Sequence, residues 1–136
     1  MIHRIDATNE SLGRLASKVA LILRGKSSPK FQPHILPDDK VIIQNIEKIK
    51  LTGRKLEQKK YYHYSGYPGG LKEKKMKDVF QKNPGEVLRR AVLGMLPKNR
   101  LRKQMIKNLQ FKPSNTTSAG FQSKNRRSAE VDILGN

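Results

Sequence analysis

The sequence predicts one α/β domain, over residues 1–112, in which helices cover a small, mainly parallel β-sheet. Three observations support this fold class. A chain of 136 residues fits a single domain. Patterns typical of strands and of amphipathic helices follow one another in the order strand, helix, strands, helices. After residue 112 the composition shifts to Pro, Ser, Thr and Asn and then to Ser, Lys and Arg, so residues 113–136 are predicted to form an extended basic arm or loop.

The beginning of the chain predicts a strand followed by a helix. Isoleucines flank a short strand over residues 2–5, and the polar residues between positions 6 and 11 are of the kind that end strands and start helices. From Leu12 to Leu23, apolar side chains recur at helical spacing and fall on one broad face, with Leu21 as an exception among the polar positions. Gly25 follows where a left-handed C-cap is expected.

Two further strands are predicted in the middle of the chain. Val41–Asn45 is short, apolar and rich in β-branched residues, and Ile49–Thr52 looks like its continuation after a turn. Together they predict a buried central strand. Tyr61–Tyr64 is another strand candidate, in which alternation places Tyr62 and Tyr64 on one face. We expect these two tyrosines to be half-buried packing residues, because that is the commoner role of tyrosine on a strand.

Two helices are predicted before the basic arm. Residues 83–86 combine an N-cap asparagine, a proline at N1 and a glutamate at N3, which is a capping-box pattern that opens a helix over Val87–Leu96. Pro97 ends that helix. A further helix is predicted over Arg100–Leu109, with its apolar residues turned inward.

The charge of the chain favours a polyanionic partner. Lys and Arg number 29 against 11 Asp and Glu, which gives a formal net charge of +18 and a pI near 10.4. Such a surface binds phosphates by releasing their condensed counterions, so nucleic acid is the leading partner, ahead of an anionic membrane surface. The absence of cysteine excludes disulfide scaffolds and thiolate metal sites. No apolar run approaches the length of a membrane span, so no segment is predicted to cross a bilayer. With nucleic acid as the leading partner, we expect no membrane partner.

The positive charge is concentrated between Glu86 and Glu130, where no acidic residue occurs. A solvated helix face normally mixes both signs, because opposite charges relieve repulsion in the compact state. We therefore interpret the run as a surface that needs an external anion, with a merely solvated face as the alternative. The basic residues of this run are Arg89, Arg90, Lys98, Arg100, Arg102, Lys103, Lys107, Lys112, Lys124, Arg126 and Arg127.

The turn after the tyrosine strand offers a second candidate contact. Gly69, Gly70 and Lys72 can bring backbone amides and an ammonium group close to phosphate oxygens, although a Gly-Gly pair is often only a turn. Catalysis has no comparable support. The three histidines lie far apart, and an aspartate pair for metal-dependent cleavage would have to combine Asp6 with the turn at 38–39. We predict no metal, no cofactor and no small-molecule substrate.

Several segments together are similar to a known family, large-ribosomal-subunit protein thirteen in its bacterial form. They cover most of residues 5–110 in order and at the expected spacing. The matching segments are Asp6–Thr8, Leu12–Ser17, Leu23–Lys26, Pro33–His34, Leu51–Gly53, Tyr61–Lys72 and Ala91–Asn99. The sequence departs from the family in a shorter leading segment, in the ending from Pro113 to Lys124, and in Leu101–Lys103, where Leu-Gly-Arg is usual.

The resemblance implies a three-layer α/β/α fold around a four-stranded parallel sheet, and no enzymatic activity. It also implies that close approach of RNA occurs at the Tyr67–Gly70 turn and the Gly94–Pro97 corner. Five basic residues are implied to meet phosphates, namely Arg24, Lys26, Lys72, Lys98 and Arg100.

Our hypothesis is a structural constituent of the large ribosomal subunit that binds and organises large-subunit ribosomal RNA during early assembly, beside neighbouring large-subunit ribosomal proteins. We expect it in the cytoplasm or an equivalent reducing compartment. An RNA-processing enzyme and a messenger-RNA-binding regulator outside the ribosome are the alternatives. The predicted RNA-binding residues are Arg24, Lys26, Gly69, Gly70, Lys72, Arg89, Arg90, Lys98, Arg100, Arg102, Lys103, Lys107, Lys124, Arg126 and Arg127.

Overall fold

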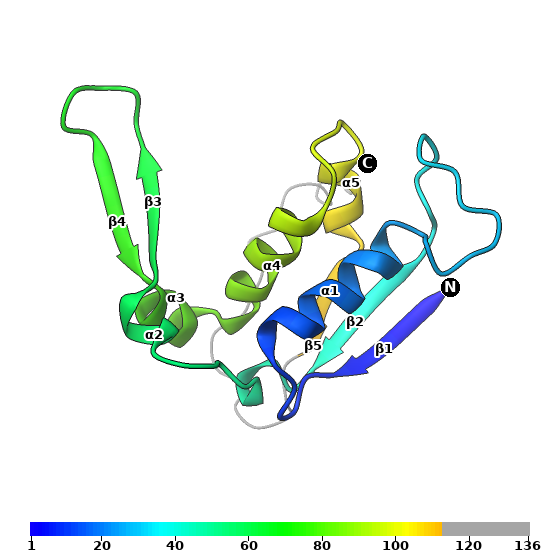
Figure 1. Cartoon of the computed structure of the whole chain (residues 1–136), viewed down its shortest axis with the longest axis horizontal. Coiled ribbons are helices and arrows are strands. Elements are labelled where there is room, and N and C mark those ends of the chain that lie inside the picture. Colours follow the sequence, from blue (N-terminus) through cyan, green and yellow to red (C-terminus); the bar gives the residue numbers. More distant parts are fainter. Residues whose placement is uncertain (113–136) are drawn as a thin grey trace, which may run out of the picture.

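The computed structural model describes residues 1–112, which form a parallel sheet, helices packed on it and a separate hairpin (Figure 1). The predicted arm at 113–136 lies outside the described residues. The elements are β1 (Ile2–Asp6), α1 (Leu12–Leu23), β2 (Lys40–Gln44), the 3-10 helix η1 (Ile46–Lys48), α2 (Lys55–Gln58), β3 (Lys60–Tyr64), β4 (Leu71–Lys75), α3 (Met76–Lys82), α4 (Pro84–Met95), α5 (Arg102–Lys107) and β5 (Leu109–Lys112).

The main sheet has three parallel strands in the order β1-β2-β5, with Ile2 paired to Lys40 and Val41 paired to Leu109. The central position of β2 confirms the strand predicted from Val41. Its predicted continuation over residues 49–52 is wrong. Asn45 adopts a left-handed conformation at φ 53° and turns the chain into η1, so only one later residue, Lys50, forms an isolated bridge to the main chain of residue 11.

The core lies between one face of this sheet and the helices α1 and α4. Leu15 and Val19 of α1, Ile43 of β2 and Leu88 of α4 are fully buried in the same cluster. This confirms the inner face predicted for the first helix. Its other sequence features also hold, because Gly25 follows the helix at φ +78° and Leu21, the apolar exception on the polar side, is 51% exposed.

The described residues differ from a four-stranded, three-layer arrangement. Tyr61–Tyr64 belongs to β3, which pairs antiparallel with β4 in a sheet of its own instead of joining the parallel one. Within residues 1–112, helices cover the sheet face that holds Val41 and Ile43, whereas Arg4 and Gln110 of the opposite face are exposed. The described part of the chain therefore has two layers and a hairpin.

The last two helices are present with altered ends. Helix α4 begins at Pro84, as predicted, but the Asn83 side chain forms no capping hydrogen bond, and the Glu86 carboxylate pairs with Arg90 one turn later. The predicted helix over 100–109 is shorter at both ends. Leu109 begins β5 beside Val41, since the backbone N–H of Val41 donates to the carbonyl of the preceding Asn108.

The β3–β4 hairpin stands away from the sheet and the longer helices, with α2 and α3 at its base (Figure 1). At that base the N–H of Met76 donates to the Lys59 carbonyl at 2.9 Å, and Met76 itself is fully buried. The prediction that Tyr62 and Tyr64 are packing residues is wrong, because both are 61% exposed. A two-stranded hairpin that projects from the body provides no second layer to cover that face.

Candidate nucleic-acid interface

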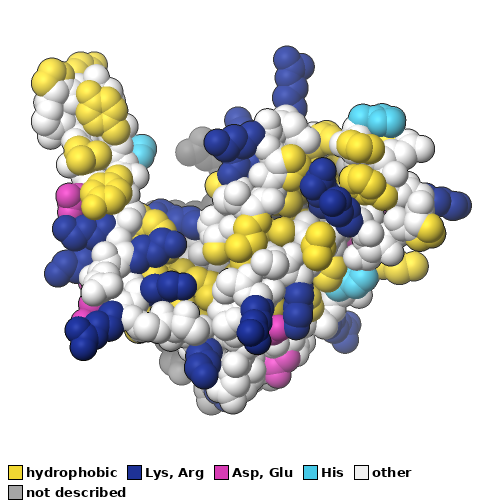
Figure 2. Space-filling view, viewed as in Figure 1, with side chains coloured by type: hydrophobic (Ala, Val, Ile, Leu, Met, Phe, Trp, Pro, Cys, Tyr) yellow, Lys and Arg dark blue, Asp and Glu magenta, His cyan; other side chains and the backbone are white. Residues whose placement is uncertain are grey.

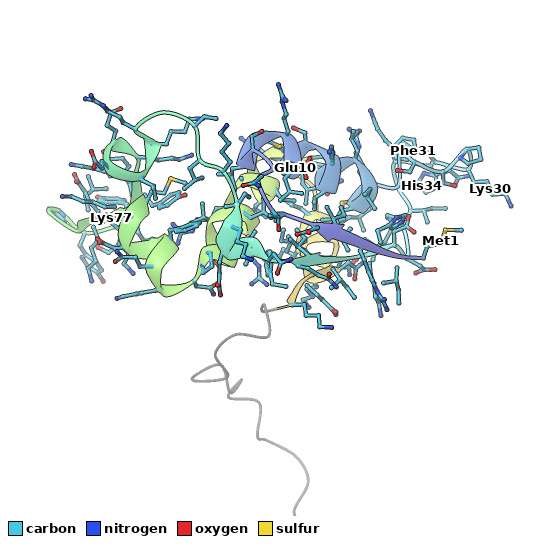
Figure 3. All side chains as sticks on the ribbon, turned by 90° about the horizontal axis from the view of Figure 1, so that it is seen from below. Met1, Glu10, Lys30, Phe31, His34 and Lys77 are labelled. Carbon is cyan, nitrogen blue, oxygen red and sulfur yellow. The ribbon has the colours of Figure 1, made fainter. Side chains whose placement is uncertain are left out.

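The predicted RNA-binding residues of the described chain gather at two ends of the parallel sheet. Helix α1 ends and β5 begins at the edge where the strands start, since Ile2, Lys40 and Leu109 share that edge. The hairpin and the first turns of α4 lie toward the opposite edge (Figure 1). Figure 3 shows the same separation, with Phe31 at the end where the chain begins and Lys77 at the other. We call these the strand-start group and the hairpin group.

Arg24 and Lys26 enter the strand-start group from the end of α1. The left-handed Gly25 between them turns the chain away from the helix, and a Cβ at that position would lie 3.0 Å from Cβ of Pro37. The Arg24 guanidinium lies 5.7 Å from the ring centroid of Phe31, which holds the half-buried side chain against the following loop. Lys26 is exposed.

The corner between α4 and α5 brings Lys98 and Arg100 into the same group. Pro97 prevents continuation of α4, and the N–H of Asn99 donates to the Pro97 carbonyl at 2.9 Å. The Asn99 side-chain oxygen then accepts a hydrogen bond at 3.0 Å from the first backbone N–H of α5. The tight corner leaves both cationic side chains exposed.

Helix α5 extends the strand-start group by one turn. Lys103 and Lys107 are exposed and four residues apart, so they share one face of the helix. The opposite side is anchored by Met105, which is 2% exposed in the core. This confirms the predicted orientation of the helix, with cations outward and apolar residues inward.

Arg102, also a predicted phosphate contact, is turned inward instead. Its guanidinium donates a hydrogen bond to the carbonyl of Leu93 near the end of α4, and its Nε atom is buried without a partner among the described residues. A cation at a helix C-terminus satisfies a carbonyl that the helix leaves free. Arg102 therefore connects α5 to α4, and we do not include it in the candidate interface.

The hairpin group contains Lys72 on β4 and Arg89 and Arg90 on α4, all exposed. Arg90 lies 4.6 Å from the ring centroid of Tyr61, and its Nε atom lies 3.0 Å from the Glu86 carboxylate. Arg90 thus has an internal counter-charge, which the sequence pattern did not reveal. Partial burial raises the pKa of Tyr61, so this phenol remains neutral in the contact.

Gly69 and Gly70 form the turn at the hairpin tip. Gly69 has φ +72°, a backbone conformation that residues other than glycine rarely adopt. A Cβ on Gly70 would lie 3.0 Å from the Tyr67 carbonyl oxygen and closer still to the Ser65 hydroxyl. The turn itself requires both glycines, and their approach to RNA stays a prediction.

Sequence reasoning missed part of the hairpin group. Lys59, Lys74, Lys75 and Lys77 are all exposed around the hairpin base. Figure 2 shows Lys and Arg side chains across this face and over the central helices, with few acidic side chains among them. The lysines on both sides of Glu73 were a usable signal in the sequence, although they lie outside the acid-free stretch after Glu86. Lys124, Arg126 and Arg127 lie outside the described residues.

The residues considered for catalysis do not converge. Asp6 ends β1 and accepts hydrogen bonds from the backbone N–H and the hydroxyl of Thr8, which lower its pKa. Asp39 lies at the opposite edge of the sheet, 3.5 Å from the Nε2 atom of His3. Within residues 1–112, no group of three or more His, Asp or Glu side chains could hold a metal ion. No helix in this range is long and apolar enough to cross a bilayer.

Comparison with known proteins identifies the family. The family model for ribosomal protein L13 matches residues 1–115. The chain belongs to the ribosomal protein L13 family. The large ribosomal subunit protein uL13 of Aquifex aeolicus is 57% identical over 105 residues, which span 77% of this chain and 73% of the relative. Its counterpart in Lawsonia intracellularis is 56% identical over the same shares, and that of Thermobifida fusca is 51% identical over 107 residues, 79% of this chain and 72% of the relative.

Membership in the L13 family confirms several of the sequence-based conclusions. The resemblance to a bacterial ribosomal family was correct, and the chain is a ribosomal protein, not an enzyme. Its location is the ribosome in the cytoplasm.

Proposed function

We propose that this L13-family chain is a structural constituent of the large ribosomal subunit that binds large-subunit ribosomal RNA and holds it in a fixed geometry during early assembly. The observation that carries this proposal is the placement of exposed cations at two ends of the sheet, on elements anchored in the core. Neighbouring large-subunit ribosomal proteins are its other proposed partners.

Phosphate neutralisation is the proposed source of affinity. Cationic side chains release counterions from the RNA, and their fixed positions select RNA by the arrangement of its backbone, not by base sequence. In the strand-start group, Arg100, Lys103 and Lys107 are exposed and have no ion pair among the described residues. They are therefore available to phosphates without the loss of an internal contact.

The test is the salt dependence of binding to large-subunit ribosomal RNA. If the protein makes about 6 to 10 phosphate contacts, affinity falls by roughly 10³- to 10⁵-fold between 50 and 200 mM salt. Replacing Arg100, Lys103 and Lys107 together by Gln should reduce the slope of log K against log salt by about 2 to 3. Thermal unfolding should change little, because all three side chains are exposed.

A charge-matched variant separates position from total charge. Arg4→Gln, Arg14→Gln and Lys50→Gln also remove three exposed cations, at positions outside both groups. This control should retain most of the wild-type slope. Equal losses in the two triple variants would show that net charge alone drives binding, and a salt-insensitive affinity of the wild type would contradict the proposed mechanism.

A further inference from the structure

All four tyrosines of the chain, at positions 61, 62, 64 and 67, lie in the β3–β4 hairpin, and the sequence contains no tryptophan. Tyr62 and Tyr64 are each 61% exposed, Tyr67 is 76% exposed, and Leu71 is 54% exposed. Aromatic side chains usually contribute to stability by burial, so their concentration on the surface of one projecting element calls for a partner.

The strand register divides the hairpin into two unlike faces. Tyr62 lies opposite Glu73 and Tyr64 lies opposite Leu71, so these four side chains share one face. Nearer the base of that face, Lys60 Nζ lies 2.9 Å from the Glu73 carboxylate. From base to tip, this face therefore carries Lys60 opposite Lys75, then Tyr62 opposite Glu73, then Tyr64 opposite Leu71.

The other face carries Lys72 and Lys74, whereas Lys60 and Lys75 lie at the base of the tyrosine face. His63 pairs with Lys72, and Tyr61 pairs with Lys74. Tyr61 is distinct from the other tyrosines, because it is half-buried with Arg90 at 4.6 Å and Lys59 at 5.7 Å from its ring centroid. It belongs to the packing at the hairpin base. Tyr62 and Tyr64 are the rings of β3 that remain open to a ligand, and Tyr67 is exposed in the turn beyond them.

Charge decides what kind of partner this face can take. Residues 59–75 contain five lysines and a single acid, Glu73, and that acid is engaged by Lys60. A basic protein would be repelled by this hairpin, whereas a polyanion would be attracted. Unpaired RNA nucleotides match both the exposed rings and the positive charge of the hairpin, because their bases stack on aromatic rings while their phosphates contact lysines.

We propose that Tyr62 and Tyr64 form a stacking platform for two unpaired bases of RNA, with Lys72 and Lys74 on the reverse face available to the flanking phosphates. Two residues along a strand separate the rings by roughly 7 Å, so each ring serves a separate base. Leu71 widens the apolar surface beside Tyr64. This inference rests on the proposed function and specifies the RNA feature that the hairpin group takes, namely single-stranded nucleotides.

Tyrosine fluorescence tests the proposal directly, because every tyrosine lies in the hairpin and no tryptophan obscures the signal. The full chain is titrated with a short single-stranded oligoadenylate and, separately, with an RNA duplex of the same length. Stacked bases should quench the emission in the first titration and leave it nearly unchanged in the second. Equal quenching by the duplex would overturn the proposal.

Variants test whether the rings themselves supply affinity. Tyr62→Leu with Tyr64→Leu should weaken oligoadenylate binding by roughly tenfold or more, without a change in the salt slope, because stacking releases no counterions. Tyr62→Phe with Tyr64→Phe should retain wild-type affinity, since phenylalanine keeps the ring. Leu21→Ala, a change at another exposed apolar side chain on α1, should have no effect.

The outcomes separate this inference from the function on which it rests. Salt-dependent RNA binding without quenching, and with no loss in the leucine variant, would overturn the stacking platform and leave the proposed function intact. Absence of any RNA binding by the wild type would overturn both. A leucine variant that binds oligoadenylate normally but fails to enter large subunits would assign this face to a protein partner and would also overturn the proposal.

Discussion

Replacing Gly94 by alanine should stabilise the free protein and weaken its binding to RNA. Gly94 lies in the last turns of α4, is exposed, and a Cβ built on it would meet no atom within 4 Å. Nothing inside the described protein therefore requires a glycine there. An exposed helical glycine replaced by alanine stabilises a helix by about 0.5–1 kcal/mol. For a chain of this size, the midpoint of thermal unfolding should rise by roughly 2–6 °C.

The affinity of the Gly94→Ala variant for RNA should fall if the corner after α4 packs closely against the RNA backbone. A methyl group at Gly94 then has to be accommodated at the contact, and overpacking of this kind costs about 1–3 kcal/mol. The expected loss is therefore about 5- to 150-fold in affinity for large-subunit ribosomal RNA at fixed salt. The measurement pairs thermal unfolding of the free variant with its RNA affinity.

Gly25→Ala provides the matched control for the stability half of this argument. Gly25 has φ +78°, and an added Cβ would lie 3.0 Å from Pro37, so the same chemical change should destabilise the protein by about 1–2 kcal/mol. A Gly94→Ala protein that is less stable than the wild type would contradict the open surroundings of that residue. A more stable variant with unchanged RNA affinity would remove the corner from the interface.

Three other predictions concern charge and packing. Asp6→Asn should destabilise the protein at neutral pH, because hydrogen bonds lower the pKa of this carboxyl in the folded state. The difference in unfolding free energy between wild type and variant should shrink as the pH falls below the ordinary pKa of 3.8, which unfolding at pH 7 and at pH 3 measures. Leu88→Ala should cost about 2–5 kcal/mol of unfolding free energy, since Leu88 is fully buried, whereas Leu21→Ala should stay within about 0.5 kcal/mol. Glu86→Gln removes the acid beside Arg90 and should steepen the salt slope of RNA binding; an unchanged or shallower slope would place Arg90 outside the interface.

The sequence predicted correctly those elements whose spacing of apolar residues along the chain already indicates a helix or a strand. The apolar spacing of α1 and the β-branched run of β2 both describe faces that are buried in the fold. Strand β4 gave no such signal, because Leu71–Lys75 is exposed at every position and is a strand only through its pairing with β3. For the same reason the tyrosines on β3 could not be placed. Alternation shows which residues share a face, but only tertiary structure shows whether that face is covered.

The candidate interface shows the same limit for charged residues. Arg102 and Lys103 are adjacent in a uniformly basic run, and composition gives no reason to separate them. The difference is made by the α4–α5 corner, which brings the Leu93 carbonyl within reach of Arg102 and leaves Lys103 exposed. The sequence could therefore predict that this run meets an anion. It could not predict which cation is used to hold the two helices together.

The separation of the two cationic groups bears on how the proposed RNA complex would work. A five-residue strand spans about 17 Å, roughly twice the Debye length of about 8 Å at physiological salt, so the groups at its two edges are largely screened from one another. An RNA segment that neutralises the strand-start group leaves the hairpin group nearly unaffected, and that group still attracts phosphates at full strength. Two segments can then be bound almost independently by one rigid body, whose core fixes the distance between them. Under the proposed function, the rigidity of the sheet is what converts two nonspecific electrostatic contacts into a selection for one RNA geometry.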